Sequence, residues 1–105
     1  MIKPRQLSKK DVLSILKAEQ PYLEKKFGVE HIAVFGSFAK GKPTLKSDVD
    51  VVIKLKRRLG FEFFDLVDHL EKKLGRNVDA LTTAGIEGIR VKSIAEDIKR
   101  SMVDV

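Results

Sequence analysis

The sequence predicts a small protein of the α/β (α+β) class. Apolar residues recur at the spacing of amphipathic helices in residues 8–28 and 63–75, and short apolar or alternating runs typical of strands lie between and after them. The 105 residues contain no internal repeat, low-complexity tract or linker. We therefore expect one domain over residues 1–105, with its elements in the order α-β-β-α-β-α.

The first expected helix begins at Ser8, an N-cap with Asp11 at the capping-box position, and ends at Gly28. Pro21 interrupts the pattern and predicts a kink or a break near Gln20, because proline lacks the amide that a helix interior needs. The apolar face of this helix comprises Val12, Leu13, Leu16 and Leu23.

Strands are predicted at His31–Phe35, Asp48–Leu55 and Asn77–Leu81. A polar loop from Phe38 to Ser47 joins the first two, with Gly41 and Pro43 as turn residues, and a basic turn over residues 56–60 follows the second.

A second amphipathic helix ends at Gly75, and its spacing is set by Phe63, Leu66, Val67, Leu70 and Leu74. We expect Phe63 and one of its neighbours, Phe61 or Phe64, to pack in the core. Residues 82–88 are predicted to form a loop, and a last helix is marked by Ile94, Ile98 and Met102. A terminal strand could follow at Val103–Val105.

Composition excludes several classes of protein. Without cysteine there are neither disulfides nor thiolate metal sites. No apolar run approaches the roughly 20 residues of a membrane helix, and the basic N-terminus lacks the apolar segment of a signal peptide. We therefore expect a cytoplasmic protein. The net charge of +6 favours an anionic partner, although solubility explains it equally well.

Two carboxylates mark the second predicted strand. Asp48 and Asp50 are two residues apart and project from one face, while Val49, Val51 and Ile53 project from the other. Neighbouring carboxylates repel each other unless a cation lies between them, and oxygen ligands suit Mg²⁺ or Mn²⁺. The alternative is a polar turn followed by a solvated strand face.

Gly36 and Ser37 directly follow the first predicted strand. Glycine permits close approach of a phosphate, and exposed amides and the hydroxyl can bind its oxygens; a simple strand-ending turn is the alternative. Lys40, Lys42 and Lys46 add positive charge, although each alone is typical of a solvated loop. Asp79, in the third strand, is either a further metal ligand and general base or a surface carboxylate.

The spacing Gly36-Ser37, ten residues, Asp48-Val49-Asp50 resembles the signature of polymerase-β-like nucleotidyltransferases, and the run GSFAKGKPTLKSDVDVVI resembles their minimal nucleotidyltransferase (MNT) branch. The downstream strand of that branch matches at residues 78–81. Two departures are Lys40, where arginine is commoner, and the absence of a proline after Thr83.

The resemblance implies a small polymerase-β-like core, with helices packed on a mixed sheet, that transfers a nucleotide from ATP in a Mg²⁺-dependent reaction. It implies that Asp48, Asp50 and Asp79 are the catalytic metal ligands. The residues that it implies in nucleotide binding are Gly36, Ser37, Lys40 and Ser47.

MNT proteins usually accompany a HEPN protein, so the resemblance also implies a toxin–antitoxin pair in which AMP is transferred to a tyrosine hydroxyl of the HEPN toxin. Three alternatives are a module that neutralises its partner by docking alone, a transferase acting on a small molecule, and a nucleic-acid-binding protein. The last would use Lys54, Lys56, Arg57 and Arg58, but no interleaved aromatic platform accompanies them, so we do not expect direct nucleic-acid binding.

Overall fold

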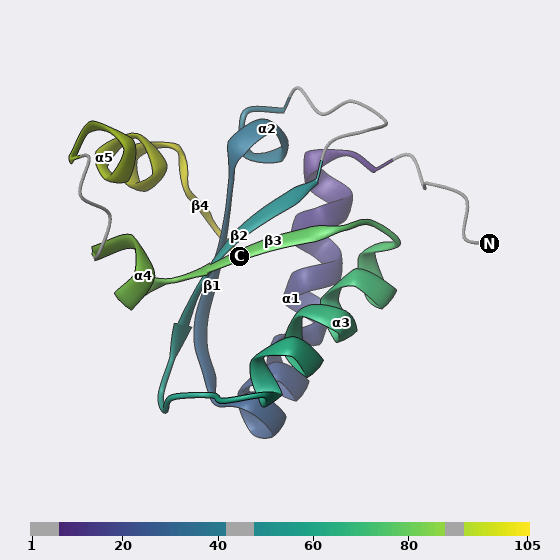
Figure 1. Cartoon of the computed structure of the whole chain (residues 1–105). Coiled ribbons are helices and arrows are strands. Elements are labelled where there is room, and N and C mark those ends of the chain that lie inside the picture. Colours follow the sequence, from purple (N-terminus) through teal and green to yellow (C-terminus); the bar gives the residue numbers. More distant parts are fainter. Residues whose placement is uncertain (1–6, 42–47, 88–91) are drawn as a thin grey trace.

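The computed structural model describes residues 7–41, 48–87 and 92–105. Its strands form a four-stranded mixed sheet in the order β3-β2-β1-β4, in which β1 is antiparallel to β2 and β4, and β2 is parallel to β3 (Figure 1). The elements are α1 (Lys9–Phe27), β1 (Val29–Phe35), α2 (Gly36–Ala39), β2 (Val49–Leu55), α3 (Glu62–Leu74), β3 (Val78–Thr82), α4 (Thr83–Glu87), α5 (Lys92–Ser101) and β4 (Val103–Asp104).

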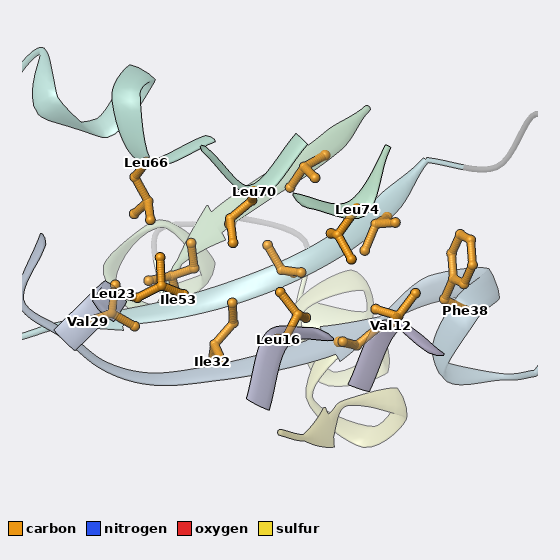
Figure 2. Packing of buried hydrophobic residues seen from close by; sticks show 14 of the residues in the cluster. Val12, Leu16, Leu23, Val29, Ile32, Phe38, Ile53, Leu66, Leu70 and Leu74 are labelled. Carbon is orange, nitrogen blue, oxygen red and sulfur yellow. The ribbon is translucent and has the colours of Figure 1, made fainter. Parts of the chain in front are cut away.

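Helices α1 and α3 lie side by side against one face of the sheet, and the core fills the space between them and the strands (Figures 1 and 2). Cross-strand partners in an antiparallel pair project from the same face, so Ile32 and Ile53 meet in this core, as do Val34 and Val51. Leu66, Leu70 and Leu74 come from α3, and all are fully buried.

Helix α1 begins with the predicted capping box: the Ser8 hydroxyl accepts the Asp11 amide and the Asp11 carboxylate accepts the Ser8 amide. It ends at Gly28, which has a left-handed conformation. The predicted break near Gln20 is wrong, because the helix continues through Pro21. Pro21 is exposed, so water can solvate the carbonyl of Lys17 that the proline ring leaves without an amide partner.

Two predicted loops contain helical turns. Residues 36–39 form α2 instead of opening the loop predicted from Phe38, and Phe38 itself is fully buried. Residues 83–87 form α4, although residues 82–88 were predicted to be a loop; the Thr82 hydroxyl accepts the Gly85 amide at 3.0 Å and so satisfies a donor at the start of the turn. Pro43 and Gly88 lie outside the described residues.

The three predicted strands are present with shifted ends, and the terminal strand is confirmed as β4, whose register pairs Ala33 with Asp104. The last helix is confirmed as α5. None of the helices in the described ranges is long and apolar enough to span a membrane.

The expectation that two of the three neighbouring phenylalanines pack in the core is wrong. Phe63 is half-buried against the core, whereas Phe61 and Phe64 are 89% and 70% exposed. The helix begins at Glu62, so only one position in this short run faces the sheet.

We expect Leu70→Ala to lower the free energy of unfolding by about 2–5 kcal/mol, because the truncation leaves a cavity between α3 and the sheet. Phe64→Ala is the matched control on the same helix and should have a much smaller effect, since its ring is exposed. Urea denaturation followed by circular dichroism measures both. Similar losses for the two variants would contradict this description of the core.

Candidate active site

The topology brings three chain segments to one end of the sheet. Because β1 and β2 are antiparallel, the end of β1 lies beside the start of β2, and Phe35 pairs with Asp50. Because β2 and β3 are parallel, their starts also adjoin, and Asp50 pairs with Asp79. The Gly36–Ser37 turn and the carboxylates of Asp48, Asp50 and Asp79 therefore occupy the same end, which we call the carboxylate end.

Hydrogen bonds fix the starts of β2 and β3 relative to α3. The amide of Val49 donates to the carbonyl of Asn77 at 2.9 Å. The amide of Val78 donates to Oε2 of Glu71 in α3 at 3.0 Å. The two donor residues are next to Asp48, Asp50 and Asp79 in the sequence. The hydrogen bonds therefore fix the backbone of β2 and of β3 close to the three carboxylates.

The predicted division of β2 into two faces is confirmed. Val49, Val51 and Ile53 are fully buried toward α1 and α3, while Asp50 is half-buried on the opposite face and Asp48, just before the strand, is exposed. Asp79 is exposed on β3, the outer strand next to β2. All three carboxylates are thus accessible from outside the core.

Gly36 is in direct contact with Asp50. Its φ of +72° lies in the left-handed region. A Cβ atom at this position would collide with Oδ2 of Asp50 and lie 3.2 Å from its Cγ. Glycine is therefore required both by the backbone conformation and by the carboxylate packed against it, and Ser37 follows at once as the second residue of α2.

Burial raises the pKa of the Asp50 carboxyl, and the negative charges of Asp79 and then of Asp48 raise it further. Crowding of like charges on a half-buried group is unfavourable in the protein alone, and a cation beside Asp50 would relieve it.

The donor chemistry at this end fits a hard divalent cation, because three carboxylates lie on adjoining segments and repel one another at Asp50. Within the described ranges, however, no group of three acidic, imidazole or thiol side chains lies in an arrangement that could hold a metal ion. Binding would have to draw the carboxylates closer together than they lie here.

The other predicted residues are more peripheral. Ser37 is half-buried, and Lys40 is exposed at the end of α2, where its amide donates to the Gly36 carbonyl at 3.1 Å. Ser47, Lys42 and Lys46 lie outside the described residues.

Sequence reasoning missed Arg76, which lies between α3 and β3. It is only 9% exposed, and its guanidinium carbon lies 5.4 Å from the ring centroid of Phe38, the residue that follows Ser37. Arg76 thus links the segment before Asp79 to the turn that carries Gly36. A single arginine after a helix-ending glycine resembles a solvated turn residue, so the sequence offered no signal.

A mixed sheet with helices on one face, and a glycine–serine turn packed against carboxylates on its open side, defines the class of nucleotidyltransferases. Residues 14–105 match the nucleotidyltransferase domain family, and the chain belongs to that family.

Among similar proteins, a candidate protein adenylyltransferase of Methanocaldococcus jannaschii is 36% identical over 92 residues, which cover 84% of this chain and 92% of the relative. The protein adenylyltransferase MntA of Thermococcus cleftensis is 30% identical over 93 residues, covering 88% and 94% respectively.

Solved structures share the fold. A candidate minimal nucleotidyltransferase superposes with a TM-score of 0.74 at 22% identity, covering 95% of this chain and 98% of the other. A toxin–antitoxin crystallised with AMP-PNP gives a TM-score of 0.62 at 17% identity, covering 93% and 72%. The chain therefore has the polymerase-β-like nucleotidyltransferase fold, as its sequence predicted.

We expect Gly36→Ala to destabilise the protein more than Gly41→Ala. Both glycines have a φ of +72°, so both substitutions carry the cost of a left-handed alanine, roughly 1–2 kcal/mol. Only at position 36 does the new methyl group meet a side chain of the described residues, because none of them lies within 4 Å of a Cβ at Gly41. Thermal unfolding of the two variants measures the difference, and equal shifts would show that Asp50 does not pack against Gly36.

We expect Asp50→Asn to raise the midpoint of thermal unfolding at pH 7 in EDTA. The folded-state pKa of Asp50 is raised above the ordinary 3.8, so the unfolded chain ionises first as pH rises, and ionisation favours unfolding. The gain should vanish below that value, where both states are protonated.

Asp65→Asn, at an exposed position on α3, is the control for removal of a surface charge. A loss of stability in Asp50→Asn at pH 7, or a gain that persists unchanged in acid, would contradict the repulsion at the carboxylate end.

Proposed function

We propose that this nucleotidyltransferase transfers AMP from ATP to a tyrosine hydroxyl of a HEPN-type toxin and so acts as its antitoxin, in a reaction that requires Mg²⁺ or Mn²⁺. We also propose that residues 1–105 form one domain and that the protein works in the cytoplasm.

The observation that carries this proposal is the packing of Gly36 against Asp50, with Asp79 in register on the next strand. The turn is suited to binding phosphate and the carboxylates are suited to binding cations. Because the two are in contact, they can bind the phosphates and the metal ions of one metal–triphosphate complex, which is what transfer of a nucleotidyl group requires.

In the proposed reaction, Gly36 and Ser37 hold the outer phosphates through backbone amides and the serine hydroxyl, with Lys40 and Ser47 as further contacts. The acceptor oxygen attacks the α-phosphorus of ATP. A new oxygen–phosphorus bond forms, the bond from that phosphorus to the bridging oxygen breaks, and pyrophosphate leaves. Asp79 receives the hydroxyl proton, because its side chain is exposed where an acceptor can approach.

Asp48, Asp50 and Asp79 would hold the divalent cations. Bound there, the cations would neutralise phosphate charge and make the acceptor hydroxyl more acidic. The raised pKa of Asp50 supports this assignment, since a cation would offset the burial and the repulsion from Asp79 and Asp48 that raise it.

The similar proteins support a protein acceptor. The relatives from Thermococcus and Methanocaldococcus carry names of protein adenylyltransferases, and a toxin–antitoxin with a related fold was crystallised with AMP-PNP. The chain spans more than nine-tenths of the length of those relatives, so the similarity extends over nearly the whole of each. Their names favour a protein acceptor over a small molecule.

We expect Asp79→Asn to abolish transfer of AMP while preserving most of the affinity for ATP, because Asp48 and Asp50 remain. General-base catalysis alone contributes about 10²–10⁴-fold. The chain is incubated with ATP, Mg²⁺ and a purified HEPN-type protein, and the mass of that protein is then measured. Asp65→Asn is the control carboxylate and should transfer AMP normally.

Addition of one AMP by the native chain and by Asp65→Asn, but not by Asp79→Asn, supports the proposal. If the native chain binds and neutralises the partner without adding AMP, the docking alternative is correct instead. Transfer by Asp79→Asn at the native rate would remove Asp79 from the proton-accepting role.

A further inference from the structure

A concave site lies where β2 and β3 end. It has a volume of about 800 Å³ and lies between the turn after β2, the start of α3, the end of β3 and α4. We call it the distal groove; its lining comprises residues 55–60, Phe63, Phe64 and residues 80–85. On β2 the groove lining begins at Leu55, five residues and roughly 16 Å along the strand from Asp50, whereas on β3 it begins at Ala80, the residue after Asp79.

The distal groove has an apolar floor and an exposed aromatic wall. Leu55, Leu59 and Phe63 are only partly buried there. Phe64 is 70% exposed at its side, and Phe61, just outside the lining, is 89% exposed. These two rings are two of the three large hydrophobic side chains exposed in the described part of the chain. Clustered apolar exposure of this kind is typical of a surface that another molecule covers.

The rim of the groove is basic. Lys56, Arg57 and Arg58 line it, and none of its described lining residues is acidic. Lys56 contacts Glu24 at 2.8 Å, and Arg57 contacts Glu62 at 3.3 Å. Arg58 is exposed and forms no ion pair with a carboxylate of the described ranges. The pairing of Lys56 and Arg57 lowers their availability for a nucleic-acid backbone, whereas Arg58 can receive a single carboxylate.

We propose that the distal groove binds an acidic segment of a partner protein, one that inserts apolar side chains against Phe63 and Phe64 and places a carboxylate at Arg58. Charge complementarity selects this occupant. A second copy of this chain carries a net charge of +6 and would meet the basic rim with like charge. The concave floor suits projecting side chains better than a flat lipid surface.

The test uses two defined probes of about 15 residues, long enough to form a helix on binding. One carries Leu and Phe on one helical face and Glu elsewhere, and the other has Lys in place of every Glu. Each is titrated into the isotope-labelled full chain, and amide chemical shifts are followed. The acidic peptide should shift signals of Arg58, Phe64 and Thr83 and leave those of Ser37 and Asp48 unchanged; the basic peptide should bind much more weakly.

Variants then locate the contact. Phe64→Ser and Arg58→Glu should each weaken binding of the acidic peptide by about tenfold or more, since aromatic and arginine side chains dominate such contacts. Phe61→Ser removes a ring that is more exposed than Phe64 but lies outside the lining, and Lys17→Glu makes the same charge change on α1; both variants should bind nearly as the native chain does. All these positions are exposed, and dispersed amide spectra confirm that each variant is folded.

Several results would overturn the inference. Equal binding of the acidic and basic peptides, or equal losses for Phe61→Ser and Phe64→Ser, would mean unspecific apolar adhesion. The proposed occupant would also be excluded if millimolar acidic peptide caused no shifts, or caused shifts only at the carboxylate end. It would be excluded as well if the chain associated with itself and Phe64→Ser abolished that association, or if the groove bound anionic lipid vesicles in place of the peptide. The test needs neither nucleotide nor metal, so its failure would leave the proposed transfer of AMP untouched.

Discussion

The contact between Gly36 and Asp50 is the constraint on which the candidate site depends. The antiparallel register sets Phe35 beside Asp50, and the chain leaves β1 at the very next residue. It does so with a left-handed glycine whose missing side chain leaves room for the carboxylate. Phe38, two residues after Gly36, is fully buried in the core and so fixes the position of the turn. The Gly36–Ser37 turn and the Asp50 carboxylate are therefore one structural unit and cannot be displaced independently.

Much of this arrangement could be predicted from the sequence. Alternation along β2 separated Asp48 and Asp50 from the buried valines, because side chains on a strand point to opposite faces by geometry alone. Helix caps at Ser8, Gly28 and Gly75 fixed the limits of α1 and the end of α3. The pairing of strands could not be predicted in this way. Parallel pairing of β2 with β3 brings Asp79 beside Asp50, and strand patterns carry no information on which neighbour a strand selects.

The remaining misses depend on contacts between segments distant in sequence. Arg76 is buried and its guanidinium lies over the ring of Phe38, and nothing near Arg76 in the sequence indicates that contact. The short turns α2 and α4 are stabilised by burial and by a threonine hydroxyl, which outweigh the loop-like composition of these segments. Phe64 has the residue type of a core position but a helical phase that turns it outward.

The pairing of β4 with β1 has a consequence for the integrity of the sheet. Asp104 contacts His31 at 2.9 Å, and the amide of Val105 donates to the carbonyl of Ile32 at 3.1 Å. These residues shield the outer border of β1, which would otherwise present free amides and carbonyls to any extended chain nearby. A proteolytic cut after α5 would remove this shield without touching a single residue implicated in nucleotide transfer. The shortened protein would retain the residues of the candidate active site, but the exposed edge of β1 would make it prone to form fibrils.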